Sequence, residues 1–199
     1  SRDNILQAAA DIWSSAEVVR SGALGTAVST SLDETVVLDD VVYFGHSQGA
    51  VVGVPALSVD SGIRAAVLTG GGGLLVRSLL DKTEPVPVDQ WVAMGLADPD
   101  IVDPDQGRFH PVLNLLQASY ESADAVNHGP YVFDRGYFPR AGGALVLVSP
   151  GDQFSPDATQ TAMAVSMGPD RVGPGLGLLD DLDAATADGG LYRLNRGTG

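Results

Sequence analysis

Apolar residues recur along this chain with two different spacings, one typical of helices and one of strands. Over residues 3–20 they return every three or four positions, which predicts an amphipathic helix with Asp3 as its N-cap and Gly22 beyond its end. Residues 21–35 are small and polar, and predict a loop. Residues 41–44 are apolar and mostly β-branched or aromatic, which predicts a short, fully buried strand.

Further apolar stretches predict the remainder of a sheet and its helices. Residues 50–54 predict a helix packed beneath the first strand, and residues 63–69 predict a second strand that ends in a run of glycines. Residues 144–148 predict a third strand, residues 156–167 the helix after it, and residues 191–195 a last strand.

The order of these elements predicts an α/β fold. Strand, helix, strand, long insertion, strand, helix and strand is the order of a doubly wound, mostly parallel sheet with helices on both faces. Residues 74–140 contain helical stretches separated by proline-rich turns, and we expect them to form a helical and irregular lid-like insertion over the sheet. We expect residues 1–199 to form one domain.

A G-x-S-x-G motif, Gly45-His46-Ser47-Gln48-Gly49, stands between the first predicted strand and its helix. In that context the motif predicts a sharp turn that presents the serine hydroxyl above the sheet. Gly45 and Gly49 supply the absence of side chains that such a turn requires. The amide of Gln48, at the start of the helix, is placed to stabilise an oxyanion. The alternative is that Ser47 only caps the helix.

A serine nucleophile needs a base, and a carboxylate that orients the base. Where a G-x-S-x-G serine works with an acid and a histidine, the chain order is serine, acid, histidine. Asp152 follows the third strand and is placed to be that acid. Asp152 could instead only support its turn, and Asp157 is a second candidate, although its position suits the first turn of the next helix. We expect the side chain of His46, next to Ser47, to point into the protein in a structural role.

The sequence contains no histidine after Asp152, so the catalytic base of Ser47 is not identified among its residues. His110 and His128 precede Asp152; either could line a substrate pocket, but we expect both to have loop or core roles in the insertion. Where a G-x-S-x-G serine works with such a base, the base follows a last strand, so we expect it in a continuation beyond Gly199. A second oxyanion donor normally comes from a loop after an early strand, and we expect that strand to precede Ser1. The chain also opens without Met, directly in a helical pattern, so we expect it to be part of a larger hydrolase.

Composition limits the partners. The formal net charge of −14 argues against nucleic acid and anionic membranes, and the absence of cysteine excludes disulfides and thiol chemistry. No stretch reaches the length of a membrane-spanning helix. Asp98, Asp100, Asp103 and Asp105 form an acidic run, but their spacing fits no EF-hand loop, so we expect a solvated loop rather than a calcium site. We expect neither metal nor cofactor.

With these residues in hand, the chain resembles the α/β-hydrolase superfamily, and within it lipase- and esterase-like bacterial enzymes with a lid. The resemblance is carried by residues 42–49, 64–70, 109–112 and 145–156. It implies hydrolysis of a small-molecule acyl ester or lipid through an acyl-enzyme on Ser47, with Asp152 as the acid and Gln48 as an oxyanion donor. It also implies an extracellular or cell-envelope location. The missing histidine departs from the family pattern.

Three alternatives use the same machinery: an acyltransferase, a thioesterase or a peptidase. A fourth is a non-catalytic binding domain that has lost its base.

Overall fold

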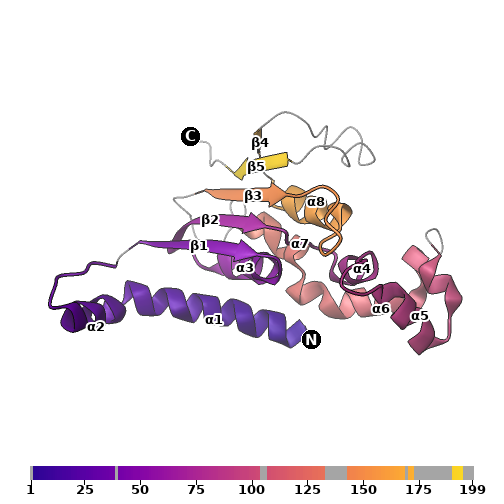
Figure 1. The fold of residues 1–199 in the computed structure, drawn as a ribbon, viewed down its shortest axis with the longest axis horizontal. Coiled ribbons are helices and arrows are strands. Elements are labelled where there is room, and N and C mark those ends of the chain that lie inside the picture. The colour runs from indigo at the N-terminus through magenta and orange to yellow at the C-terminus, as the bar shows by residue number, and fades with distance from the viewer. Residues whose placement is uncertain are drawn as a thin grey trace.

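The computed structural model describes residues 2–38, 40–103, 107–132, 143–168, 170–172 and 190–194, and shows a mixed α/β arrangement (Figure 1). Short 3-10 turns lie between its helices. The helices and strands, in chain order, are α1 (Arg2–Arg20), α2 (Ala23–Leu32), β1 (Val41–His46), α3 (Gln48–Val59), β2 (Ile63–Thr69), α4 (Leu75–Leu80), α5 (Val88–Leu96), α6 (Pro111–Tyr120), α7 (Ala125–His128), β3 (Ala144–Val148), α8 (Asp157–Ser166), β4 (Asp170–Val172) and β5 (Gly190–Leu194).

The strands form one sheet in the order β1-β2-β3-β5-β4. β1, β2 and β3 are parallel neighbours, as the alternation of strands and helices predicts. β5 is antiparallel to β3, pairing Leu194 with Ala144 and Gly190 with Val148, and β4 is antiparallel to β5. The last strand therefore lies where the sequence predicts it but runs in the opposite direction to the parallel strands, ending at the edge where they begin (Figure 1).

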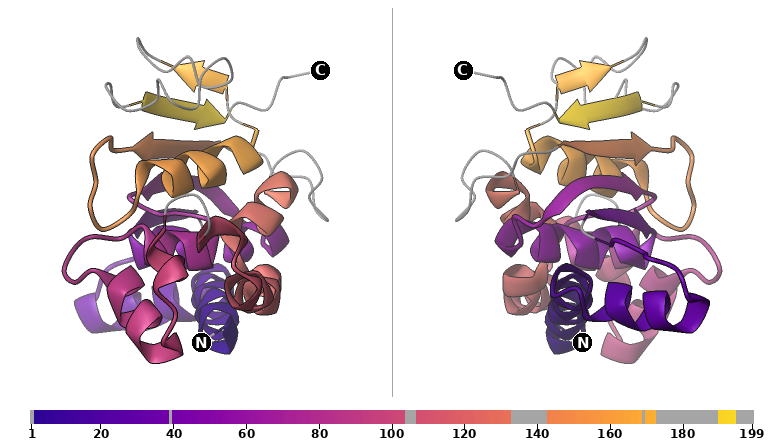
Figure 2. Two further views of the ribbon diagram at one scale, coloured as in Figure 1. Left: turned by 90° about the vertical axis from the view of Figure 1, so that its right-hand side faces the viewer. Right: turned by 90° about the vertical axis from the view of Figure 1, so that its left-hand side faces the viewer.

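The main core lies between one face of the sheet and helices α1, α3, α7 and α8. Leu68 and Val146 point from the strands toward Val54 and Leu57 of α3 and Met163 of α8, and all five are buried. α3 is apolar on nearly every side because it packs between the sheet and α1. α1 lies on the β1 side of the molecule, far from β4 and β5 (Figure 2).

The other face of the sheet is exposed in the part of the chain that the structure describes. The side chains of Val42 and Phe44 in β1 are 66% and 68% exposed, so the prediction of a fully buried strand is wrong. Phe44 pairs with Val67, which pairs with Leu145, so these side chains form a row on that face. The sequence predicts helices on both faces of the sheet, but the described helices cover only one. The buried core residues of the strands point to that face, and they alternate along each strand with the residues of this row.

The N-terminal region contains a second helix where the sequence predicts a loop. Asp3 lies in the first turn of α1 rather than at its N-cap, and Gly22, with a φ of 75°, separates α1 from α2. The prediction of a loop over residues 21–35 is wrong. It followed from the serine and threonine residues of this segment, which favour turns. In α2 the hydroxyls of Thr30 and Ser31 instead donate to helix carbonyls one turn earlier, so the helix absorbs them.

Residues 74–103 and 107–132 contain α4 to α7 and have a small core of their own, formed by Val76, Ile101 and Leu113. The side chains of Trp13 and Trp91 are both exposed. Within the described residues, none of the helices combines the length and apolar character needed to cross a membrane.

Candidate active site

The turn at Ser47 joins the end of β1 to the start of α3. Ser47 has a φ of 52° and a ψ of −119°, a combination that strains a residue with a side chain. Its amide donates to the carbonyl of Thr69 at 2.9 Å, and its carbonyl accepts from the amides of Ala50 and Val51. The hydroxyl makes no capping hydrogen bond, so Ser47 does not act as the side-chain cap that the alternative interpretation requires.

Of the two motif glycines, only Gly45 lies where the surrounding atoms leave no room for a side chain. A methyl group on Gly45 would lie 2.7 Å from the carbonyl oxygen of Gly49 and 2.8 Å from the ring of Tyr43, so no side chain fits there. At Gly49 the nearest atom, Tyr43 Oη, would be 3.8 Å away, which is ordinary contact. The predicted steric need at Gly49 is therefore wrong, because its Cα faces open space beside the tyrosine.

Tyr43 holds β1 and α3 together behind the turn. Its hydroxyl donates to the carbonyl of Gly49 at 2.6 Å, and its ring packs so closely on Gly53 that a methyl group there would lie 2.4 Å from Cε1. Burial raises the pKa of Tyr43. Sequence reasoning missed this residue, although two glycines one helical turn apart, after a strand tyrosine, are a signal of such packing.

Asp152 lies in the loop after β3 and uses its two carboxylate oxygens differently. Oδ1 accepts from the amides of Phe154 at 2.8 Å and Ser155 at 3.0 Å, so Asp152 does support its turn. Oδ2 has no hydrogen-bond partner among the described residues and faces Gly70, where a methyl group would lie 3.8 Å from it. One carboxylate oxygen thus remains available at the edge of the sheet where β1 to β3 end.

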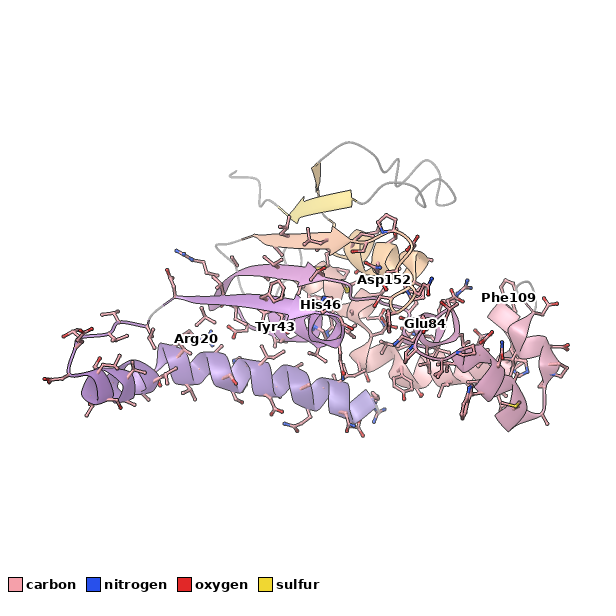
Figure 3. The ribbon with its side chains drawn as sticks, in the orientation of Figure 1. Arg20, Tyr43, His46, Glu84, Phe109 and Asp152 are labelled. Atoms are coloured by element: carbon pink, nitrogen blue, oxygen red, sulfur yellow. The ribbon has the colours of Figure 1, made fainter. Side chains whose placement is uncertain are left out.

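His46 lies beside the same glycine. A methyl group on Gly70 would be 3.3 Å from His46 Cε1 and 3.5 Å from Nδ1, and Figure 3 shows His46 and Asp152 at the same edge of the sheet. The ring is exposed, so the prediction that His46 points into the protein is wrong. The reason is the alternation of strand side chains: His46 shares the exposed face with Val42 and Phe44.

Asp157 begins α8 and accepts the amide of Gly151 at 2.9 Å and 3.1 Å, from its two oxygens. It therefore shapes the loop of Asp152, as its expected place in the first helical turn implies. The oxyanion candidate Gln48 occupies the first position of α3, where a helix leaves its amide without an intrahelical acceptor.

The other two histidines have structural contacts in the insertion. Nε2 of His110 lies 2.9 Å from Oδ2 of Asp98, and this hydrogen bond lowers the pKa of Asp98. His128 donates from Nε2 to the carbonyl of Ser122 at 2.9 Å, and its Nδ1 lies 3.4 Å from Ser58 Oγ. Neither lines the cavity at Ser47.

That cavity has a volume of about 300 Å³, and Ser47 forms part of its wall. Its walls combine the Ser47 turn, apolar side chains and a few polar groups, from Ile5, Ser47, Gln48, Val51, Gly72, Leu75, Ser78, Leu79, Lys82, Phe154 and Ser155. The wall contains no carboxylate. Such a space can hold a short acyl group next to the exposed hydroxyl of Ser47.

The segment after β2 brings α4 against this cavity, and a buried carboxylate holds it there. Asp124, 1% exposed, accepts the amides of Leu74 at 2.9 Å and Leu75 at 2.7 Å, and also binds the Val126 amide and the Gln117 side chain. The glycines before Leu74 pass between α3, α7 and α8 with no room for side chains, as a strand-exit turn requires. Sequence reasoning missed Asp124, because its partners are about fifty residues away.

The acidic run does not assemble a metal site in the described residues, where no cluster of three potential metal ligands occurs. Asp98 accepts the amide of Asp100 at 3.1 Å and contacts His110, so it caps a turn. Asp105 lies outside the described residues.

The predicted catalytic base, in a continuation beyond Gly199, lies outside the described residues. Because β5 is antiparallel to β3, its end at Leu194 lies at the edge of the sheet opposite to Ser47 (Figure 1). A residue directly after Leu194 would therefore start from the far edge. Of the described residues, no histidine lines the cavity at Ser47.

Comparison with family models, curated proteins and solved structures finds no match for this chain. The case for a function therefore rests on the geometry around Ser47.

Proposed function

We propose that this protein is a serine hydrolase that cleaves carboxylic esters through an acyl-enzyme on Ser47. The observation that carries the proposal is the strained backbone of Ser47, an exposed residue that makes no capping bond and lines a cavity with several apolar side chains. A strand, a strained serine and a helix in direct succession are the features that define a nucleophile elbow. The proposal includes the finer fold, the doubly wound sheet of an α/β-hydrolase with residues 74–140 as its lid.

The reaction proceeds in two displacements. Ser47 Oγ attacks the acyl carbon while a base takes its proton, the ester C–O bond breaks, and the alcohol leaves with that proton. Water then attacks the acyl-enzyme, releases the carboxylic acid and restores the serine. The Gln48 amide donates to the oxyanion in both steps. The apolar cavity walls bind the acyl group of a small-molecule ester or lipid.

Asp152 orients the base in this proposal. Its Oδ1 is held by two loop amides, and Oδ2 is the oxygen left to accept from an imidazole. The base is a histidine that reaches Ser47 from outside the described residues. The same machinery would serve acyl transfer, thioesters or peptides, which the turn alone does not separate.

A binding domain without catalysis is the second candidate. The observation that favours it is the lack of a histidine along the Ser47 cavity among the described residues. A serine without a base is a weak nucleophile, so such a domain would bind an acyl compound without cleaving it.

The test is hydrolysis of 4-nitrophenyl acyl esters by the protein as its gene encodes it, together with fluorophosphonate labelling. Ser47→Ala is expected to lose roughly 10³-fold or more of kcat/KM and all labelling, because removal of a catalytic serine eliminates the acyl-enzyme route. Ser14→Ala, on the exposed side of α1, is the matched control and should behave as wild type. Turnover unchanged by Ser47→Ala would refute the nucleophile, whereas folded protein inert toward every ester would favour the binding domain.

A further inference from the structure

The cavity at Ser47 contains the only lysine of the sequence. Lys82 follows α4 and lines the cavity together with Ser47 and the apolar residues of α3 and α4. In a chain with a net charge of −14, a single lysine beside the nucleophile is an unusual placement for a positive charge. Among the described residues Lys82 takes part in no ion pair, since Asp81, its neighbour, pairs with Arg77 instead.

The backbone around Lys82 is fixed to the rest of the site. The amides of Thr83 and Glu84 donate to the carbonyl of Gln153 at 3.1 Å and 3.3 Å. Gln153 follows Asp152, so these bonds connect the segment after α4 to the loop that carries the acid. On the other side of Lys82, the pair between Arg77 and Asp81 secures the end of α4.

The charges around Lys82 differ between the two cavities that it lines. The second cavity, of about 390 Å³, is bordered by three carboxylates, of Asp81, Asp89 and Asp103, and by the guanidinium of Arg77, which pairs with Asp81. Among the described residues, the wall of the cavity at Ser47 has no carboxylate, and Lys82 is its single charged lining residue. An anion a few carbons from Ser47 would meet a positive charge, neutral polar residues (Gln48, Ser78 and Ser155) and apolar side chains.

We infer that the substrate's acyl chain ends in a carboxylate and that the ammonium group of Lys82 pairs with it. This inference rests on the proposed ester hydrolysis and narrows its substrate to half-esters of short dicarboxylic acids. The small cavity supports a short chain, because an acyl group that spans from Ser47 to Lys82 must fit within it. Lys82 is thus assigned to substrate recognition and Ser47 to the chemistry.

The experiment compares kcat/KM for two esters of equal chain length, 4-nitrophenyl hexanoate and the 4-nitrophenyl monoester of adipic acid. The readout is the ratio of the charged to the neutral ester. Lys82→Met is expected to lower this ratio by roughly five- to tenfold, and Lys82→Arg to retain most of it, because a partly shielded ion pair contributes about that much. Added salt should lower the wild-type ratio by screening.

Arg64→Met is the matched control, since it removes a positive charge from the opposite end of β2. Its ratio should equal that of wild type. A ratio that Lys82→Met leaves unchanged, with Ser47-dependent turnover of both esters, overturns the inference and leaves the hydrolase intact. Equal loss of both esters in Lys82→Met also overturns it, because Lys82 would then act in the chemistry. No turnover of either ester by folded protein overturns both proposals.

Discussion

At the scale of single residues, the candidate site depends on a backbone conformation that disfavours most side chains. The positive φ of Ser47 raises the energy of the turn by about 1–3 kcal/mol, and the surroundings must stabilise it. They do so through the Ser47 amide on Thr69 and the close approach of Gly45 to the first turn of α3. The two motif glycines are therefore unequal.

Gly45→Ala is expected to lower the free energy of unfolding by about 1–3 kcal/mol, because its methyl group would overlap the Gly49 carbonyl and the Tyr43 ring. Gly49→Ala is the matched comparison. For Gly49→Ala, the free energy of unfolding should stay the same or increase by up to about 1 kcal/mol, because alanine is the better helix former and has space at this position. Urea unfolding measures both. Equal destabilisation by the two substitutions would contradict the packing described at the turn.

At the scale of elements, the position of α4 sets one wall of the cavity. α4 has only six residues, and its first amides bind the carboxylate of Asp124 rather than a capping residue of their own. Asp124 begins α7 and also accepts the amide of Val126. One buried carboxylate thus joins two short helices that would be unstable in isolation.

Asp124→Asn is expected to destabilise the protein by about 2–3 kcal/mol, because an amide group would face backbone amides that need an acceptor. The loss should also reduce ester turnover, since the α4 wall of the cavity moves. Asp33→Asn is the control: Asp33 is exposed, and asparagine tolerates its left-handed backbone. Thermal unfolding and turnover should be close to wild type in that variant. Similar losses in both would show that Asp124 has no special role.

At the scale of the whole molecule, the sheet presents two unlike faces. One face forms the core with α1, α3, α7 and α8, and the other exposes the row that contains Val42 and Phe44. Exposed apolar surface of this kind lowers solubility and promotes association. Substitutions on the two faces should therefore affect different properties.

The double substitution Val42→Thr with Phe44→Thr is expected to weaken association, so that the protein stays monomeric up to a higher concentration. The free energy of unfolding should change by less than about 0.5 kcal/mol per site, because threonine retains strand propensity at an exposed position. Val146→Thr, on the helix-covered face, should instead lower stability by about 1–3 kcal/mol by burying a hydroxyl. Light scattering and urea unfolding separate the two effects. Unchanged association in the double variant would contradict the assignment of the exposed face.

Prediction from sequence succeeded where the signal was local. The strands at residues 63–69 and 144–148 and the helix after Ser47 follow from runs of apolar residues, and the turn follows from the G-x-S-x-G motif, with Gly45 two residues before Ser47. It failed for α2, where serine and threonine hydroxyls bind the helix carbonyls, and for the face of His46. Which face of the sheet His46 lies on depends on how β1 pairs with β2, and the residues of β1 alone do not specify this pairing.

By itself, the sequence determined the parallel strands β1 to β3, the helices α3 and α8 that follow two of them, and the turn at Ser47, because these depend on side chains within a few residues of each other. Only the tertiary structure decided the direction of β5, the position of Asp152 Oδ2 near Gly70 with no hydrogen bond among the described residues, and the placement of Lys82 and Ser47 around one cavity. Each of these depends on pairing between distant segments, whose free energy comes from packing and hydrogen bonds that form when the chain is folded.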